Sequence, residues 1–345
     1  MTQTPLAPDP APAAAAPAAA APVTDRLRTA LRCVAIVSCL PYIVLKAAWI
    51  SGSHVGIPDG SPLLDHRATT AVGNGTSVLM DSAVVVIALL LTQAWGRRVP
   101  AWLLVLPMWV ATGLLLPIMT GYPLQLLVRL LGGRTAGKGD VGRPFLDEWV
   151  FGVVYTGFIV QGLALGTLFA LYARARWGHL WQGTLRELPD SPTAPVLRAA
   201  AVAASLIALA PGTLHLLWAA GSTAGLNEGR IEERTSGSAA LEAVFALFVA
   251  VAVAGVLLLA FRRGSALPLR VPLALAWGGS AATACWGGWM SIASLSDLGD
   301  IADRPTATMV LIYAVQMLAG TLVMTLGAYF LAERAAATRP PGPRA

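Results

Sequence analysis

Long apolar segments recur along almost the whole of this chain and limit what it can fold into. An apolar run of about 20 residues is long enough to cross the roughly 30 Å hydrocarbon layer of a bilayer as a helix. Only 12% of the 345 residues are charged, about half of the share that is usual for a soluble protein. The sequence therefore predicts an all-α fold, a polytopic membrane helix bundle.

Short turns and a few longer polar loops separate the apolar segments and define about eight membrane spans. The Ala/Pro-rich residues 1–24 lack the basic start and apolar centre of a signal peptide and are expected to be disordered. Residues 176–195 form a polar linker on the cytoplasmic side, and residues 334–345 form a cytoplasmic tail. The expected spans cover residues 29–52, 73–95, 101–121, 146–172, 196–221, 238–261, 271–293 and 307–331.

Both halves of the chain begin with the same sequence pattern. The segments PYIVLKAAWISGSHVG (41–56) and PGTLHLLWAAGSTAG (211–225) share Lys/His-x-x-Trp-x-x-Gly-x-x-x-Gly. Its glycines fall at the end of the expected helix, where they are expected to cap the helix and turn the chain. Weaker matches follow in the same order in both halves. They pair Pro100-x8-Trp109 with Pro268-x8-Trp277, Val160-Gln161 with Val315-Gln316, and Arg143-Pro144 with Arg304-Pro305.

These matches predict two four-helix repeats, residues 25–175 and 196–333. Because four is an even number, both repeats would enter the membrane from the same side. They would then be parallel repeats, related by a pseudo-twofold axis along the membrane normal. A site shared by the two repeats would lie near that axis.

Basic residues in the loops give the expected orientation. Lysine and arginine concentrate in the cytoplasmic loops of membrane proteins. The pairs Arg97-Arg98 and Arg262-Arg263 lie at matching points of the two halves, on the side that would also hold both termini. We therefore expect a multi-pass protein of the cell membrane with both termini in the cytoplasm. The basic residues are scattered and form no phosphate-binding face, so no nucleic-acid partner is expected.

Four ionisable residues inside the expected spans are the strongest functional pointers, because a charge is costly in hydrocarbon. They lie at similar depth, on the order of 9 Å below the outer surface at about 1.5 Å per residue. Each half has a base and an acid on successive spans. We expect Lys46 to pair with Asp81, and His215 to pair with Glu242.

Two interpretations of these pairs remain open. In the first, they are structural ion pairs that lock neighbouring helices, and Lys46 also reaches toward the outer interface. In the second, Asp81, Glu242, His215 and Lys46 form a catalytic set around a common outward-opening cavity. Glu242, whose partner is a titratable histidine, would be the better proton donor, and His215 would hold or relay the proton. Asp81, held by Lys46, would stay charged.

Tryptophan is abundant, and several of the 11 tryptophans lie deep in the expected spans or close to the acids. The face of an indole ring can stabilise a cationic ligand or intermediate, although packing explains any single tryptophan equally well. The candidates for substrate binding are Trp49, Trp109, Trp218 and Trp277, with Trp286 and Trp289 as further deep tryptophans.

Sequence motifs for other kinds of chemistry are absent. The chain contains no Walker motif, Gly-rich dinucleotide turn, Asp-rich diphosphate motif or Cys-x-x-Cys. Cys33, Cys39 and Cys285 are odd in number and lie in apolar segments, so neither a disulfide framework nor a metal site is expected. We expect no metal and no cofactor. The expected partners are a lipophilic small-molecule substrate and membrane lipid.

One acid in each half, Asp81 and Glu242, surrounded by aromatic residues resembles the arrangement in metal-independent integral-membrane terpene cyclases. The segments LPMWVATGLLLPI and FLDEWVFGVVYTGFIVQGLALGT also resemble segments of uncharacterised actinobacterial membrane proteins. The first resemblance implies a natural-product enzyme that cyclises an isoprenoid-like substrate by protonation, without a metal.

Two other classes of function compete with the enzyme. A small-molecule transporter, proton-coupled through Glu242 and His215, is consistent with parallel repeats. Pro41, Pro107, Pro117 and Pro211, the first and last at matching positions, are consistent with it, because proline frees backbone groups inside a helix bundle. In a non-catalytic scaffold or sensor, the charge pairs would only fix helix packing. Loss of product in variants of the two acids would favour the enzyme, and saturable substrate flux would favour the transporter. A change in stability alone would favour the scaffold or sensor.

Overall fold

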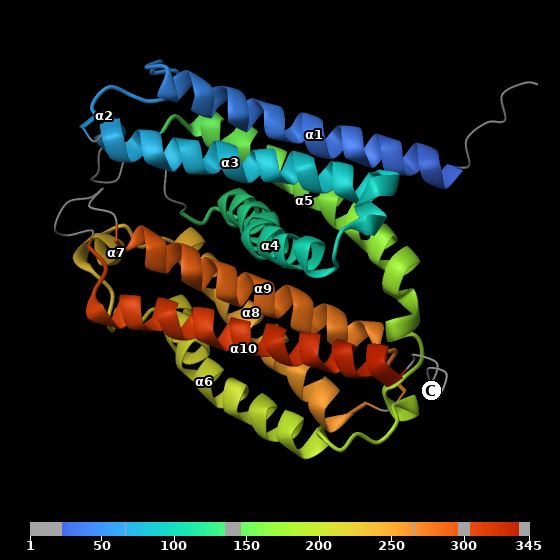
Figure 1. The fold of residues 1–345 in the computed structure, drawn as a ribbon. Coiled ribbons are helices and arrows are strands. Elements are labelled where there is room, and N and C mark those ends of the chain that lie inside the picture. The colour runs from blue at the N-terminus through green and yellow to red at the C-terminus, as the bar shows by residue number, and fades with distance from the viewer. Residues whose placement is uncertain (1–22, 66, 135–145, 265, 296–303, 338–345) are drawn as a thin grey trace, which may run out of the picture.

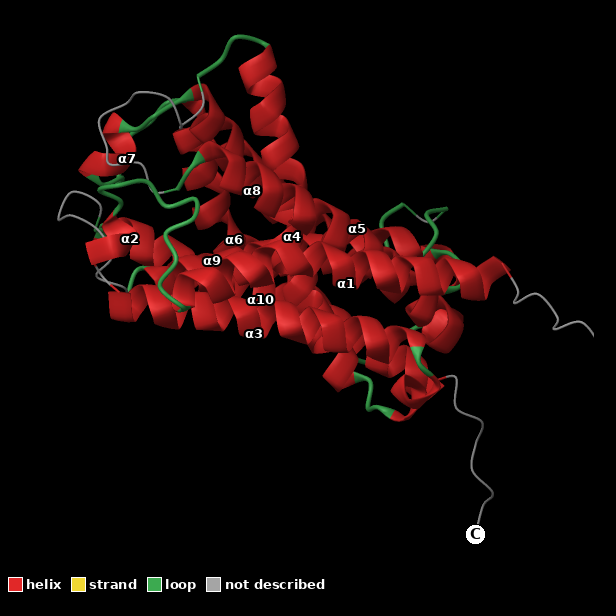
Figure 2. Cartoon of the chain, turned by 90° about the horizontal axis from the view of Figure 1, so that it is seen from above, coloured by secondary structure: helices red, strands yellow, loops and turns green. Residues whose placement is uncertain are grey.

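The structure is a computed structural model that describes all residues except 1–22, 66, 135–145, 265, 296–303 and 338–345. Every regular element within the described residues is a helix (Figure 2). Seven of these helices are long and apolar enough to cross a membrane, namely α1, α3, α4, α5, α6, α8 and α10. The chain is therefore a multi-pass membrane protein with an all-helical fold.

Three long helices of the first half pack together as one bundle (Figure 1). They are α1 (Val23–Ile50), α3 (Arg67–Thr92) and α5 (Glu148–Trp177). Small side chains at the contacts, such as Ala35 and Cys39 of α1 and Ala88 of α3, are fully buried in the core of this bundle. Small residues let helix backbones approach closely in a membrane, where packing rather than hydrophobic burial drives helix association.

Four long helices of the second half form the other bundle, namely α6 (Ala194–Ala220), α8 (Ser236–Phe261), α9 (Arg270–Ala293) and α10 (Ala307–Ala337). Helix α9 has neighbours on several sides, because it packs against α8, α10 and α4. It is not among the seven helices that meet the criterion for a membrane span. A helix covered by protein does not need the apolar surface that lipid requires. The expected eighth span, which corresponds to α9, stays a prediction.

Helix α4 (Trp102–Leu130) lies between the two bundles and joins them (Figure 1). It contacts α5 of the first half and both α8 and α9 of the second half. Two tryptophans hydrogen-bond across the contact with α9. Trp109 Nε1 donates to Ser280 Oγ at 3.0 Å, and Trp277 Nε1 donates to Thr112 Oγ1 at 3.3 Å. Each tryptophan thus bonds to the residue three positions after the other tryptophan.

Glycines allow α9 to lie almost in backbone contact with its neighbours. A Cβ atom built on Gly279 would lie 2.3 Å from the backbone nitrogen of Ala252 in α8, and one built on Gly255 of α8 would lie 2.3 Å from the backbone nitrogen of Ala276 in α9. Similar close approaches to Ala281 and Tyr313 occur at Gly113 of α4 and Gly287 of α9. Side chains larger than hydrogen do not fit at these positions.

The two copies of the opening pattern end in the same local structure. Trp49 Nε1 donates to Val55 O at 2.7 Å, and Trp218 Nε1 donates to Ala224 O at 2.9 Å. The glycine after each helix has the positive φ that glycine adopts at little cost. These glycines are Gly52 with φ +95° and Gly221 with φ +117°. The expected capping and turning role of the glycines is confirmed.

Short helices lie at both ends of the long ones. Helices α2 (Pro62–Asp65) and α7 (Glu228–Glu232) are at one end, whereas the 3-10 helices η1 (Ala94–Arg98), η2 (Gly178–Trp181) and η3 (Leu185–Glu187) belong to the other end, where α1 begins and α10 ends (Figure 1). The expected linker is held in place there, because Arg262 Nη1 donates to Leu188 O at 3.0 Å.

The helix boundaries differ from the expected spans mainly at the ends. Helix α1 begins at Val23, α4 continues past Gly121 to Leu130 with Pro123 inside it, and α10 continues to Ala337. The turns that extend α1 and α10 are polar and carry no apolar signal, whereas α4 continues through Pro123 into a further apolar segment. The rest of the expected N- and C-terminal tails lies outside the described residues.

The contact between α8 and α9 gives a stability prediction. Gly279→Ala should lower the free energy of unfolding by about 1–3 kcal/mol, the usual cost of forcing extra atoms into a packed contact. Gly327→Ala in α10 is the control, because no atom lies within 4 Å of a Cβ built there. Thermal unfolding of the purified protein in detergent, followed by tryptophan fluorescence, measures both. Equal midpoints for the two variants would contradict the close contact.

Candidate functional site

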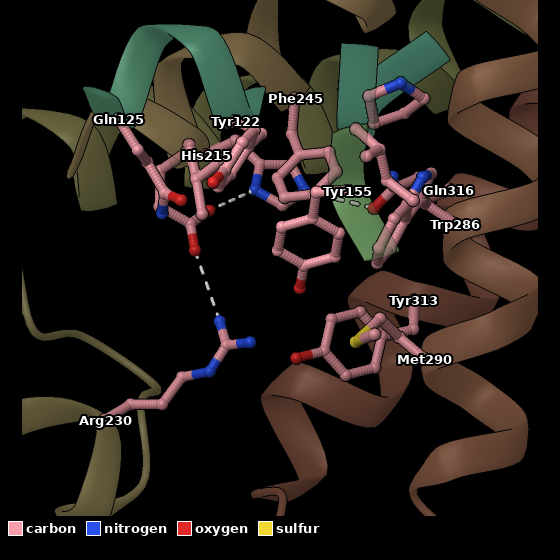
Figure 3. Close-up of a pocket in the computed structure, with 14 residues that line it drawn as sticks. Tyr122, Gln125, Tyr155, His215, Arg230, Phe245, Trp286, Met290, Tyr313 and Gln316 are labelled. Carbon is pink, nitrogen blue, oxygen red and sulfur yellow. Dashed lines mark hydrogen bonds and ion pairs between the residues drawn. The ribbon is translucent and has the colours of Figure 1, made fainter. Parts of the chain in front are cut away.

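A cavity of about 200 Å³ lies where the two halves meet, and both halves contribute to its wall. Helices α4 and α5 line it from the first half, and helices α6 to α10 line it from the second. Figure 3 shows the side chains around the open space. The lining residues are Pro117, Ile118, Tyr122, Gln125, Tyr155, His215, Arg230, Leu241, Glu242, Phe245, Trp286, Met290, Tyr313 and Gln316.

The Glu242 carboxylate contacts two basic side chains, His215 and Arg230, in the wall of this cavity. Its Oε2 atom lies 2.6 Å from Nδ1 of His215, and its Oε1 atom accepts from Nη1 of Arg230 at 3.2 Å (Figure 3). The side chains of His215 and Glu242 are 5% and 13% exposed, whereas that of Arg230 is 42% exposed. The pair predicted between His215 and Glu242 is thus confirmed. The third member, Arg230, is the accessible one.

Both ring nitrogens of His215 are engaged. Nδ1 faces the Glu242 carboxylate, and Nε2 lies 3.0 Å from Oε1 of Gln316 in α10. Each ring nitrogen therefore faces an oxygen atom of a neighbouring helix. Trp218 meets the ring edge to face, with centroids 5.3 Å apart, and Phe245 covers it at 5.4 Å. The ring is therefore fixed in one orientation between three helices.

Aromatic residues form much of the remaining wall. The rings of Tyr122 and Tyr155 meet edge to face with centroids 5.0 Å apart, and Phe245 and Trp286 lie 5.7 Å apart. The hydroxyls of Tyr155 and Tyr313 point into the open space near Arg230 (Figure 3). The buried Nε1–H of Trp286 has no hydrogen-bond partner in the part of the chain that the structure describes. The wall of the cavity thus consists largely of aromatic rings.

The predicted pair in the first half is wrong. Lys46 Nζ donates to Oδ1 of Asn74 at 2.9 Å and lies over the rings of Tyr42 and Trp49, 4.9 Å and 4.7 Å from their centroids. Asp81 instead accepts a long hydrogen bond of 3.5 Å from Nε2 of Gln161 in α5. The asparagine and the two ring faces satisfy the ammonium, so it does not need the carboxylate.

Asp81 also lies outside the wall of the cavity described above. It is 4% exposed and lies in the bundle of α1, α3 and α5, and neither it nor Lys46 lines the cavity. The expectation of one cavity shared by both acids is therefore not met. Of the four candidate catalytic residues, the structure brings together His215 and Glu242.

None of the four tryptophans expected to bind substrate lines the cavity. Trp49 and Trp218 fasten the loops after α1 and α6, and Trp109 and Trp277 bond across the contact between α4 and α9. An indole N–H buried in a membrane protein needs an acceptor, and these four find theirs in the scaffold. Trp286, named above as a further deep tryptophan, is the one in the wall.

A second, apolar cavity of about 270 Å³ follows the contact between α4 and α5. It is lined by side chains such as Leu116 and Met119 of α4 and by Gly162 and Gly166 of α5. Because Pro117 and Ile118 of α4 line the first cavity, the same stretch of helix borders both. The two cavities are therefore neighbours along α4.

The sequence alone could not identify several of these residues. Arg230 lies in a loop rich in charge, where solvated residues are the usual finding. In the sequence, Gln316 stands out only as part of a repeated Val-Gln pair, and the tyrosines carry no local pattern. These residues share only their position in space, because they all line the one cavity. The matching position of Gln161 and Gln316 in the two halves was the available signal.

Within the described residues, no group of three or more His, Cys, Asp or Glu side chains is placed to hold a metal ion. Cys33, Cys39 and Cys285 are free. Comparison of the chain with models of protein families, with curated proteins and with solved structures gave no match. Any functional conclusion therefore depends on the geometry of the cavity.

Proposed function

We propose that this chain is a membrane-embedded enzyme that isomerises or cyclises a lipophilic, isoprenoid-like substrate by protonating it. The observation that carries the proposal is the 2.6 Å contact between His215 and Glu242 in the wall of an aromatic cavity. Such a short contact between an imidazole nitrogen and a carboxylate is a charge-assisted hydrogen bond that holds a proton. A positioned acid of this kind speeds proton transfer by roughly 10²–10⁴-fold.

Arg230 controls the acid in this proposal. The guanidinium stabilises the Glu242 carboxylate as an anion, so the shared proton stays on His215 Nδ1. Because Arg230 is half-exposed on the short helix α7, an entering substrate can displace it. Without that positive charge, the proton moves from Nδ1 to the carboxylate. Glu242 then presents a neutral carboxylic acid to the substrate.

The reaction that follows is a proton relay with no net change in composition. The π electrons of a substrate double bond take the carboxyl proton and leave a carbocation. A second double bond attacks that cation, or the cation loses a neighbouring proton directly. The Glu242 carboxylate or His215 accepts the released proton, so the product is an isomer of the substrate. The ring faces of Tyr155, Phe245 and Trp286 would stabilise the cation.

The two cavities support a substrate with a long apolar part. The first cavity, at about 200 Å³, is smaller than the roughly 300–1,000 Å³ that usually encloses a ligand. The first cavity therefore has room for only the part of the substrate that reacts. The apolar cavity along α4 and α5 offers about 270 Å³ more for the chain behind it. Gly166 leaves space there, since no atom lies within 4 Å of a Cβ built on it.

A transporter is the second candidate, and one observation favours it. The cavity lies between the two halves, which is where substrate sites of repeat-built transporters occur. A proton held by His215 and Glu242 could then drive transport rather than chemistry. Product formation distinguishes the enzyme, and saturable flux across the bilayer distinguishes the transporter.

We also propose that the chain consists of two parallel four-helix repeats that cross the cell membrane eight times, with both termini in the cytoplasm. Equivalent helices contact each other in the same pairs: α1 with α3 and α5 in the first half, and α6 with α8 and α10 in the second. The reciprocal hydrogen bonds of Trp109 and Trp277 are what a twofold axis between α4 and α9 would produce.

Cysteine labelling tests this topology, including the eighth span. In a background without native cysteines, a membrane-impermeant maleimide should label His54→Cys and Leu295→Cys on intact cells. It should label Arg98→Cys and Arg263→Cys only after permeabilisation, because these positions lie at the basic end. All four native side chains are exposed. Labelling of positions 263 and 295 from one side would contradict a membrane-crossing α9.

Product analysis tests the proposed reaction. We expect cells that express the protein and receive isoprenoid precursors to form an isomer of unchanged mass. Glu242→Gln should lower product formation at least about 100-fold, since it removes the acid. Mass spectrometry of lipid extracts measures the product at matched membrane abundance of the variants.

Two further variants sharpen that experiment. Glu232→Gln, which replaces an exposed acid at the end of α7, is the control and should leave product formation unchanged. Asp81→Asn should keep it within a few-fold, because Asp81 lies outside the cavity. Equal product from the parent and Glu242→Gln would contradict the proposal. Loss of product with Asp81→Asn, at normal abundance, would favour a site that both acids share.

A further inference from the structure

Asp81 and Gln161 leave two buried oxygen atoms without partners at one place in the first half. Gln161 Nε2 lies 3.5 Å from Asp81 Oδ1, while Asp81 Oδ2 and Gln161 Oε1 are buried and have no hydrogen-bond partner among the described residues. The two residues are only 4% and 2% exposed. An ionised carboxylate and an amide oxygen are both acceptors, so neither can satisfy the other.

A single proton on Asp81 resolves this arrangement. We propose that Asp81 and Gln161 form a proton-binding site in which the carboxyl group is neutral and pairs with the amide. The Oδ2–H group donates to Gln161 Oε1, while Gln161 Nε2–H donates to Asp81 Oδ1. The two hydrogen bonds close a ring between the acid and the amide. Both orphaned oxygens then have a partner, and no net charge is buried.

The surroundings of Asp81 favour the neutral form. Among the described residues, the titratable side chains that interact electrostatically with Asp81 are Lys46, Tyr42 and Cys39 of α1. Lys46 directs its ammonium to Asn74 rather than to the carboxylate. Gln161, which faces Asp81 from α5, carries no charge. A buried carboxylate without a directly bonded cation is costly in this environment.

Polar side chains also line the stretch of α3 between Asp81 and Asn74, the partner of Lys46. Tyr42 Oη lies 3.4 Å from Ser77 Oγ, one helical turn along α3 from Asp81. Asn74 lies another turn along α3 and accepts a hydrogen bond from Lys46 of α1. Its buried Nδ2 has no partner among the described residues. Asn74, Ser77 and Asp81 thus follow one face of α3 at helical spacing.

This site would give each half of the chain its own proton-binding centre. Gln161 engages Asp81 in the first half, and Gln316 engages His215 in the second. The first centre is neutral and closed, whereas the second is charged and open to the cavity. The inference is independent of the enzyme proposal, because proton binding at Asp81 does not depend on any reaction at Glu242.

Infrared spectroscopy of the full-length protein in liposomes tests the protonation directly. At pH 7 the parent should show the carbonyl stretching band of a protonated carboxylic acid, and Asp81→Asn should lack it. Gln161→Leu should shift the band, because the carbonyl loses its hydrogen bond. Glu333→Gln is the control and should leave the band unchanged, since Ser191 and Thr193 donate to that acid elsewhere. Identical spectra of the parent and Asp81→Asn would overturn the proposal.

Thermal unfolding provides a second, independent test. An asparagine at position 81 can form the same two hydrogen bonds with Gln161, so Asp81→Asn should change the melting temperature by less than about 2 °C. Gln161→Leu should lower it clearly more. Replacing sodium chloride with choline chloride should leave the parent unchanged. Stabilisation by sodium, together with loss of the infrared band, would mean a bound metal cation in place of the proton and would overturn the proposal.

Discussion

The contact between α4 and α9 is the constraint on which the rest of the structure depends. Trp109 and Trp277 each donate a hydrogen bond to a hydroxyl on the other helix, which fixes both the register and the rotation of the pair. Gly113 lets the backbones approach, because a Cβ there would lie 2.2 Å from Ala281 O. With this contact in place, Tyr122 of α4 and Trp286 of α9 face the same space. The cavity is thus a consequence of how the halves join.

The two halves of the chain differ in electrostatics. The first half has Lys46 on α1 and Asp81 on α3, and the second has His215 on α6 and Glu242 on α8. A lysine at the end of its helix finds an amide and two ring faces, and leaves its carboxylate to a glutamine. The histidine instead meets its carboxylate directly at 2.6 Å. The acid of the first half thus contacts an amide in a closed site, whereas the acid of the second half contacts two bases in the wall of the cavity.

The sequence predicted the membrane class, seven of the helices as apolar spans, and the contact between His215 and Glu242. Those features follow from local patterns, namely runs of apolar residues and the cost of charge in hydrocarbon. It failed where the outcome depends on competition between partners. No sequence pattern indicated that Lys46 would bond to Asn74 rather than to Asp81. Nor did any pattern indicate that the indole groups of Trp49, Trp109, Trp218 and Trp277 would bond to the scaffold rather than face a ligand.

A pair of double-mutant cycles would test most directly the claim that the charged centre exists in the second half alone. The first cycle combines His215→Gln with Glu242→Gln, and the second combines Lys46→Met with Asp81→Asn. Unfolding of the purified protein in detergent gives the coupling energy of each pair. We expect about 1–3 kcal/mol for the first pair, which is in contact, and less than about 0.5 kcal/mol for the second. Equal coupling in both halves, or stronger coupling between Lys46 and Asp81, would contradict this account.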